Sequence, residues 1–175
     1  MLMKVFPHGT GEGDKPSRYL VRPDYPGRDT APPQVLRGNP AVTRALIDSI
    51  DRRWKFTSGV LSWHPDEKIC EEQEEEVMDA FERVAFAGLE ADQRNILWVR
   101  HTHAGHHELH FPIPRLELSS GKDFNACPPG WQKDFDVFRD LFNWREGWTR
   151  PDDPARARDE LPKRADLFKA RMARW

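Results

Sequence analysis

The most informative segment of this 175-residue chain reads His101-Thr102-His103-Ala104-Gly105-His106-His107-Glu108-Leu109-His110-Phe111-Pro112-Ile113-Pro114. It holds five of the seven histidines of the sequence. The dipeptide Ala104-Gly105 separates two extended runs, and its glycine suits a turn. We therefore expect a β-hairpin, with one strand within residues 95–103 and the returning strand within residues 107–118.

The returning strand predicts how the polar side chains of the hairpin are placed. Successive side chains of a strand point to opposite faces, so Leu109 and Phe111 face the core while Glu108 and His110 share the other face. His101 on the partner strand can meet this pair, because facing Cβ atoms of antiparallel strands lie about 4.5–5.5 Å apart. Two imidazoles and a carboxylate form a workable site for a divalent ion, and three protein ligands leave the open positions that catalysis needs.

The hairpin also has a plainer interpretation. A histidine-rich hairpin is often a solvated ribbon in which each imidazole is merely polar and half exposed. We assign His103, His106 and His107 to this interpretation, and we reserve the metal site for His101, Glu108 and His110. Spacing alone says nothing about the substrate.

The elements around the hairpin alternate without a repeat. Residues 22–40 carry five prolines and two glycines, so we interpret them as a surface loop. Helices interspersed with antiparallel strands favour an α+β fold over a parallel doubly wound sheet. The hydrophobic spacing predicts strands at residues 3–6 and 56–63, one or two helical turns at 15–20, and helices at 41–54, 66–89, 135–148 and 155–174.

Composition narrows the class of protein. No apolar run approaches the roughly 20 residues that a membrane span needs, and the first six residues are too short for a secretory signal. Cys70 and Cys127 have no second thiol at metal-ligand spacing, which is typical of a reduced, cytoplasmic protein. The net charge is −2, but the acidic excess is confined to residues 61–95. The remaining chain is basic and therefore compatible with a phosphate backbone.

The hairpin segment resembles the metal motif of relaxases from small mobilisable plasmids of the colicin-plasmid type. That motif has His, then Glu seven residues later and Asn two further on, followed by an apolar strand and a Ser-Gly-Lys turn. His101, Glu108 and the turn Ser120-Gly121-Lys122 match. His110 stands in the place of Asn, and most other HUH-type nucleases use only histidines there. Further matches in order include Leu36-Arg37-Gly38-Asn39-Pro40, Thr57-Ser58-Gly59-Val60-Leu61-Ser62, Met78-Asp79-Ala80-Phe81-Glu82 and Pro151-Asp152-Asp153-Pro154.

The resemblance implies a fold and a reaction. The fold is an antiparallel sheet of about five strands with helices packed on one face, as one relaxase domain over residues 1–175 or as the catalytic part of a longer protein. In the reaction, a tyrosine attacks one phosphodiester of single-stranded DNA at an origin of transfer, forming a 5′-phosphotyrosine. The family's tyrosine corresponds to Tyr19, and the one other tyrosine, Tyr25, lies in the Pro-rich loop.

The resemblance also implies partners. The cofactor is a divalent ion, Mn or Mg by preference, with Zn or Ni as alternatives. Accessory mobilisation proteins are expected as further partners, and no interaction with a membrane is expected. Candidate general bases are His8, His103 and His106. Binding of a single strand should use cationic side chains, and the candidate phosphate contacts are Arg18, Arg22, Arg52, Arg53 and Lys55.

Two other functions stay open on sequence alone. One is a degenerate HUH domain that binds an origin or a DNA hairpin without cutting it. The other is a metal hydrolase that uses a metal-bound water on a phosphoester and therefore needs no tyrosine.

Overall fold

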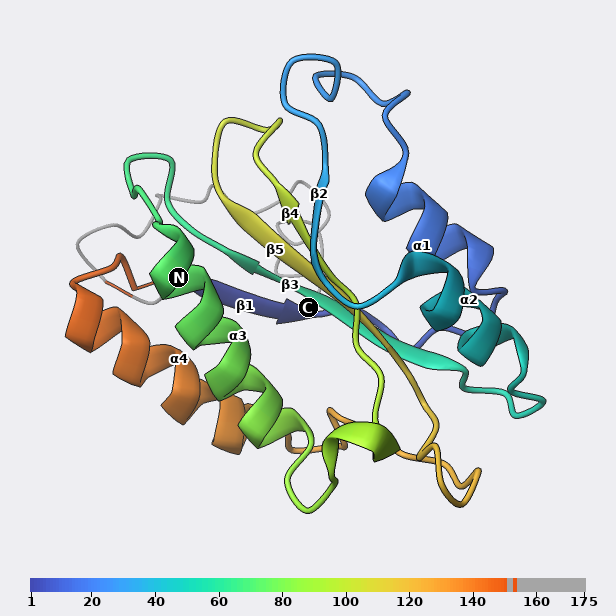
Figure 1. The fold of residues 1–175 in the computed structure, drawn as a ribbon. Coiled ribbons are helices and arrows are strands. Elements are labelled where there is room, and N and C mark those ends of the chain that lie inside the picture. Colours follow the sequence, from blue (N-terminus) through green and yellow to red (C-terminus); the bar gives the residue numbers. More distant parts are fainter. Residues whose placement is uncertain (151–152, 154–175) are drawn as a thin grey trace, which may run out of the picture.

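The chain forms a five-stranded antiparallel sheet with four α-helices packed on it, as the computed structural model shows for residues 1–150 and Asp153 (Figure 1). The strands lie in the order β1-β3-β5-β4-β2. The expected α+β class and strand number are therefore confirmed. The elements are β1 (Leu2–Val5), α1 (Asp14–Val21), β2 (Gln34–Arg37), α2 (Pro40–Asp48), β3 (Phe56–Ser62), α3 (Glu71–Ala85), the 3-10 turn η1 (Ala91–Gln93), β4 (Trp98–His101), β5 (Glu108–Pro114) and α4 (Gln132–Glu146).

The sequence prediction of the elements needs two corrections. The Pro-rich stretch at 22–40 contains β2, an edge strand that pairs with β4 through a register shift. Helices α2 and α3 are shorter than expected; α2 starts where the Asn39 side chain accepts hydrogen bonds from the amides of Ala41 and Val42. The helix expected at 155–174 lies outside the described residues. None of the described helices is long and apolar enough to cross a membrane.

The main core lies between the sheet and the helices α3 and α4. Leu109, Phe111 and Ile113 of β5 are at most 1% exposed and point to this side. The Phe81 ring of α3 lies 4.5 Å from the Phe111 ring and 5.1 Å from the Phe135 ring of α4. The alternation that the sequence predicted for β5 is therefore present, and it sends Glu108 and His110 to the opposite side.

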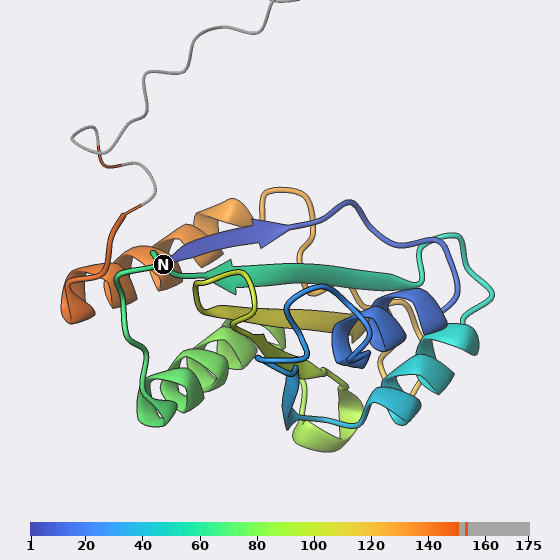
Figure 2. The same ribbon diagram turned by 90° about the horizontal axis from the view of Figure 1, so that it is seen from above.

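The opposite face of the sheet carries α1 and α2, which lie side by side in both views (Figures 1 and 2). Strand β4 contributes side chains to both layers. Trp98 belongs to the main core, whereas its neighbour Val99 packs with Leu20 of α1 in a second, smaller cluster. Helices thus cover both faces rather than only one. This second layer places α1, with Tyr19, above the polar face of the hairpin.

Candidate active site

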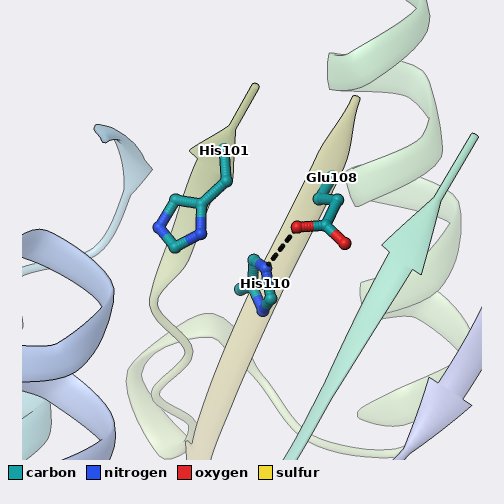
Figure 3. A group of neighbouring side chains, drawn as sticks. All are labelled: His101, Glu108 and His110. Atoms are coloured by element: carbon teal, nitrogen blue, oxygen red, sulfur yellow. Dashed lines mark hydrogen bonds and ion pairs between the residues drawn. The ribbon is translucent and has the colours of Figure 1, made fainter. Parts of the chain in front are cut away.

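Three side chains of the hairpin converge on the face beneath α1. Register pairs His101 of β4 with Glu108 of β5, and Val99 with His110. One donor atom from each of His101, Glu108 and His110 lies within 4.8 Å of the other two. Figure 3 shows the three side chains pointing toward one another from two neighbouring strands. The expected juxtaposition is present; the role of these residues as metal ligands stays a prediction.

His101 is held in one orientation and one protonation state. Its ring is 2% exposed, and Nε2 lies 2.8 Å from the carbonyl oxygen of Leu20 in α1. Because a carbonyl only accepts, Nε2 carries the proton and Nδ1 keeps its lone pair. Burial lowers the pKa of His101 to about 4, so the imidazole is neutral at pH 7. A neutral imidazole with a fixed outer hydrogen bond is the form that binds metals.

Glu108 supplies a permanent negative charge. His110 Nε2 lies 3.2 Å from one carboxylate oxygen, and His106 Nε2 lies 3.0 Å from the other. The hydrogen bond from His110, together with that from His106, lowers the pKa of Glu108 to about 2 against the opposing effect of burial. The carboxylate is therefore ionised at all pH values at which the protein is expected to work.

The donor set fits a divalent transition ion. Metal–nitrogen and metal–carboxylate bonds are about 2.0–2.2 Å long, so two donors of one ion lie at most about 4.2 Å apart. The three donor atoms lie within 4.8 Å of one another, so small side-chain movements bring them to the spacing of ligands of one ion. Two imidazoles and one carboxylate would balance part of the charge of such an ion and would leave coordination positions for phosphate oxygens.

Tyr19 lies on α1 beside this cluster and remains 43% exposed. A series of edge contacts joins it to the cluster: its ring centroid lies 5.6 Å from that of Tyr25, and Tyr25 lies 5.8 Å from His103. His103 lies 5.2 Å from His101, which lies 4.5 Å from His110. The phenol thus combines access to solvent with a continuous packed connection to the three side chains.

Arg28 forms the centre of this arrangement, and it is 1% exposed. One guanidinium nitrogen donates to the carbonyl oxygens of Tyr19 (2.6 Å) and Arg22 (3.0 Å) at the end of α1. The other lies 3.5 Å from Nδ1 of His101. The guanidinium carbon lies 5.0 Å from the Tyr19 ring centroid and 4.8 Å from that of Tyr25. A buried cation therefore lies between both phenols and the predicted metal ligands.

The environment of Tyr19 raises its pKa above the ordinary value of a phenol. Partial burial, Tyr25 and the negative charge of Glu108 raise the pKa of Tyr19, whereas the positive charge of Arg28 lowers it. Deprotonation of Tyr19 is therefore favoured by Arg28 and opposed by burial, by Tyr25 and, least, by the Glu108 charge. A divalent ion beside Glu108 has the positive sign that favours a phenolate.

The remaining histidines have different surroundings. His107 points to the α3 side, where Nε2 lies 2.5 Å from the buried carboxylate of Glu74. His8 lies next to Thr57 and Trp54, apart from the other candidates for a general base. His103 lies against Tyr25, and its Nδ1 is buried without a hydrogen-bond partner among the described residues.

Sequence reasoning missed Arg28, and it missed the contact of Tyr25 with Arg28 and His103. His103 and His106 are half-buried, in line with the half-exposed histidines that the sequence predicted. The loop that carries Arg28 folds against the hairpin, where Gly27 has φ +81° and approaches the carbonyl oxygen of His103. A side chain at this position would be strained whatever the space available. The sequence Pro26-Gly27-Arg28 resembles an ordinary exposed turn, so no local signal marks Arg28 as buried.

Two curated proteins are similar to almost the entire chain. "Cryptic plasmid protein C" of Neisseria gonorrhoeae is 41% identical over 170 residues, which cover 95% of this chain and 80% of that protein. "DNA relaxase MbeA" of Escherichia coli is 36% identical over 169 residues, or 93% of this chain. The chain belongs to the plasmid mobilisation relaxase family. It spans about a third (32%) of the length of MbeA.

Other comparisons add nothing to this assignment. No protein-family model matches the chain, and no solved structure matches it significantly. The assignment of the chain to the relaxase family therefore rests on the two relatives. It agrees with the resemblance of the hairpin to the relaxase metal motif.

The cationic candidates of this relaxase-family chain divide into two groups. Arg18 and Arg22 line an open cavity of about 560 Å³ beside Tyr19, together with Lys15 and Asp14. The second group belongs to the link between α2 and β3. There Arg52 donates to the carbonyl oxygens of Gly121 and Arg115, the Arg53 guanidinium lies 4.6 Å from the Trp54 ring, and Lys55 is half-buried.

Proposed function

We propose that this relaxase-family chain cuts and rejoins one DNA strand at an origin of transfer, with Tyr19 as the nucleophile. The proposal rests on one observation above all. An exposed tyrosine is packed, through Tyr25 and His103, against a convergent His101–Glu108–His110 cluster. The name of the similar "DNA relaxase MbeA" supports the assignment to DNA.

The chemical step exchanges one ester for another. Tyr19 Oη forms a bond to the scissile phosphorus, the bond from phosphorus to the 3′-oxygen breaks, and the freed 3′-oxygen takes up a proton. The 5′-phosphotyrosyl ester keeps the energy of the broken bond, so the strand can be rejoined without ATP. The attack by Tyr19 requires deprotonation, because an ordinary phenol has a pKa near 10.

The protein's own groups assist this deprotonation. Arg28 lies against the Tyr19 ring and favours its phenolate. We assign the phenol proton to His103, through Tyr25, since burial and then the Arg28 charge lower the pKa of His103 and keep it neutral. Of the three histidines considered as general bases, His103 is the one in contact with Tyr25.

We assign the divalent ion to His101, Glu108 and His110. When bound, the ion supplies Lewis-acid stabilisation of the charge that develops on the phosphate. Mn or Mg is expected, and the two imidazoles favour a transition ion such as Mn, Zn or Ni over Mg. The Leu20 carbonyl orients His101, and His106 orients Glu108, so both ligands have an outer hydrogen bond.

We assign the DNA backbone to cationic side chains on both sides of the site. Arg18 and Arg22 beside Tyr19 contact phosphates next to the cut, and Arg52, Arg53 and Lys55 contact the strand further along. The chain then represents a relaxase domain that works in the cytoplasm with accessory mobilisation proteins. Such proteins would be needed to open the duplex, because the substrate is a single strand.

A gel assay tests this function. The protein is incubated with Mn²⁺ or Mg²⁺ and single-stranded oligonucleotides tiled across the replicon that encodes it, then separated under denaturing conditions. We expect a shifted DNA band that protease removes, lost in Tyr19→Phe and with chelator, and kept in the control Trp144→Phe, which changes an exposed aromatic side chain of α4. Cleavage without an adduct would replace the proposal with a metal hydrolase. Binding without cleavage on every oligonucleotide would indicate a degenerate binding module.

A further inference from the structure

A second, largely apolar cavity adjoins Tyr19 on the side away from the cationic one. Its volume is about 250 Å³. It lies between α1 and the outer face of β3 and β5, so one wall is helix and the other is sheet. Its walls include Phe6, Pro16, Tyr19, Ser58, His110 and Pro112.

The position of this cavity relates it to the reaction proposed above. Tyr19 and His110 both line it, so it borders the nucleophile and one of the three predicted metal ligands. A nucleotide next to a phosphate held between Tyr19 and the three ligands would therefore lie within reach of this cavity. Tyr19 also lines the cavity of Lys15, Arg18 and Arg22, which would be within reach of the nucleotide on the other side.

The chemistry of the cavity suits one nucleobase. Pockets for drug-sized ligands are about 300–1,000 Å³, so 250 Å³ suits a smaller, flat group. Phe6 and Tyr19 provide aromatic faces for stacking, and Ser58 provides a hydroxyl that can both donate and accept a hydrogen bond. Lys4 Nζ lies 5.6 Å from the Phe6 ring centroid, so a positive charge lies next to one wall of the cavity.

We infer that this cavity binds the base of one nucleotide next to the scissile phosphate and thereby fixes which phosphodiester Tyr19 reaches. This inference rests on the proposed function. Stacking alone tolerates every base, whereas the volume of the cavity and the Ser58 hydroxyl limit the size and the edge of the base that enters. Part of the selectivity for the DNA sequence at the cut would thus come from the cavity next to Tyr19.

The test combines base removal with filling of the cavity. The wild-type protein first identifies the oligonucleotide that it cuts and the scissile position. Tyr19→Phe protein then binds that oligonucleotide, measured by fluorescence anisotropy, with an abasic residue placed at each position in turn. We expect about 5- to 150-fold weaker binding at one position adjacent to the cut, the range that stacking of one base accounts for.

The variant Ser58→Phe, made in the Tyr19→Phe protein, fills the cavity. It should bind the intact oligonucleotide as weakly as the unfilled protein binds the abasic one, and it should be insensitive to that abasic residue. The matched control is Leu2→Phe, which adds a phenyl ring to a strand at a position 45% exposed and outside the cavity. Thermal unfolding of both variants checks their folding. Phe6→Ala, which removes a stacking face without adding volume, provides an independent variant with the same expected loss.

Two outcomes separate the inference from the proposed function. A covalent adduct together with equal binding for every abasic position next to the cut overturns the base pocket and leaves the nuclease assignment intact. The absence of an adduct with every oligonucleotide overturns the proposed function, and the inference with it. Normal affinity and normal abasic sensitivity in Ser58→Phe would also reject the cavity as the binding site.

Discussion

A guanidinium nitrogen of Arg28 lies 3.5 Å from Nδ1 of His101, the ring nitrogen that keeps its lone pair. The same guanidinium lies against the Tyr19 ring. A positive charge next to a predicted metal ligand opposes binding of a cation, so its position needs another function. Stabilising the Tyr19 phenolate is the function that its contacts support.

Replacement of Arg28 should therefore move the pH dependence of DNA cleavage. In Arg28→Met the pKa of Tyr19 rises. The pH at which the cleavage rate increases should therefore move upward by about one unit, and the rate at pH 7 should fall about tenfold. Arg28→Lys keeps the positive charge but not the planar guanidinium, so its pH profile should lie between those of the wild type and Arg28→Met. Single-turnover rates between pH 6 and 10 measure this. Arg145→Met, on the exposed side of α4, serves as the control, and an unchanged profile in Arg28→Met contradicts the assignment.

The variant His110→Asn should change metal preference. An amide oxygen replaces an imidazole nitrogen, which weakens binding of Mn, Zn or Ni relative to Mg. We expect the ratio of apparent dissociation constants for Mg²⁺ and Mn²⁺ to fall by about tenfold or more, because one of two imidazole ligands is lost. Calorimetric titration measures it without DNA. If the ratio is unchanged while Glu108→Gln abolishes binding, His110 is not a ligand.

The metal-free protein should lose stability between about pH 6.5 and pH 4. The folded-state pKa of His101 is about 4, below its ordinary value of 6.5, so protons bind the unfolded chain first as the pH falls. The contribution of neutral His101 to the free energy of unfolding is complete above pH 6.5 and is lost as the pH falls toward 4. At about 1.4 kcal/mol per pKa unit, the total loss is roughly 3 kcal/mol. Urea unfolding at a series of pH values measures it, and His101→Asn should lack this component. Glu108, with a folded-state pKa of about 2, contributes stability that is lost only below pH 4.5.

The two cysteines should react at very different rates. Cys70 is exposed, whereas Cys127 is 2% exposed and burial raises the pKa of its thiol to about 12. Iodoacetamide at pH 8 should therefore add one group to the native protein and two to the unfolded protein. Intact-mass measurement distinguishes these numbers, and rapid double labelling of native protein would show that the core around Cys127 opens.

The hairpin could be predicted because its geometry is local. Alternation along β5 and a short turn fix which side chains of residues 101–110 share a face, and the structure has His101 opposite Glu108 as expected. The sheet class followed for the same reason. Strand β2 could not be predicted, since its pairing with β4 is a long-range contact formed by a short edge strand in a Pro-rich segment.

The rest of the site depends on tertiary packing that no pattern in the sequence encodes. Arg28 and Tyr25 lie in a turn-rich loop, and the close approach of Gly27 to His103 and the hydrogen bonds of Arg28 to the end of α1 hold this loop beside the hairpin. Burial of a charged side chain at 1% exposure runs against the usual preference of arginine for the surface. Sequence reasoning therefore named the candidate ligands and the candidate nucleophile, whose roles stay predictions, but not the cation between them.

Mapping of the covalent bond tests the central claim most directly. Protein with its DNA adduct is trimmed by nuclease and digested by a protease that cuts before aspartate, which separates Tyr19 in residues 14–23 from Tyr25 in residues 24–28. Mass spectrometry then locates the nucleotide remnant. The account predicts the remnant on residues 14–23, linked to the Tyr19 oxygen. A remnant on residues 24–28, or cleaved DNA with no remnant on either peptide, would contradict it.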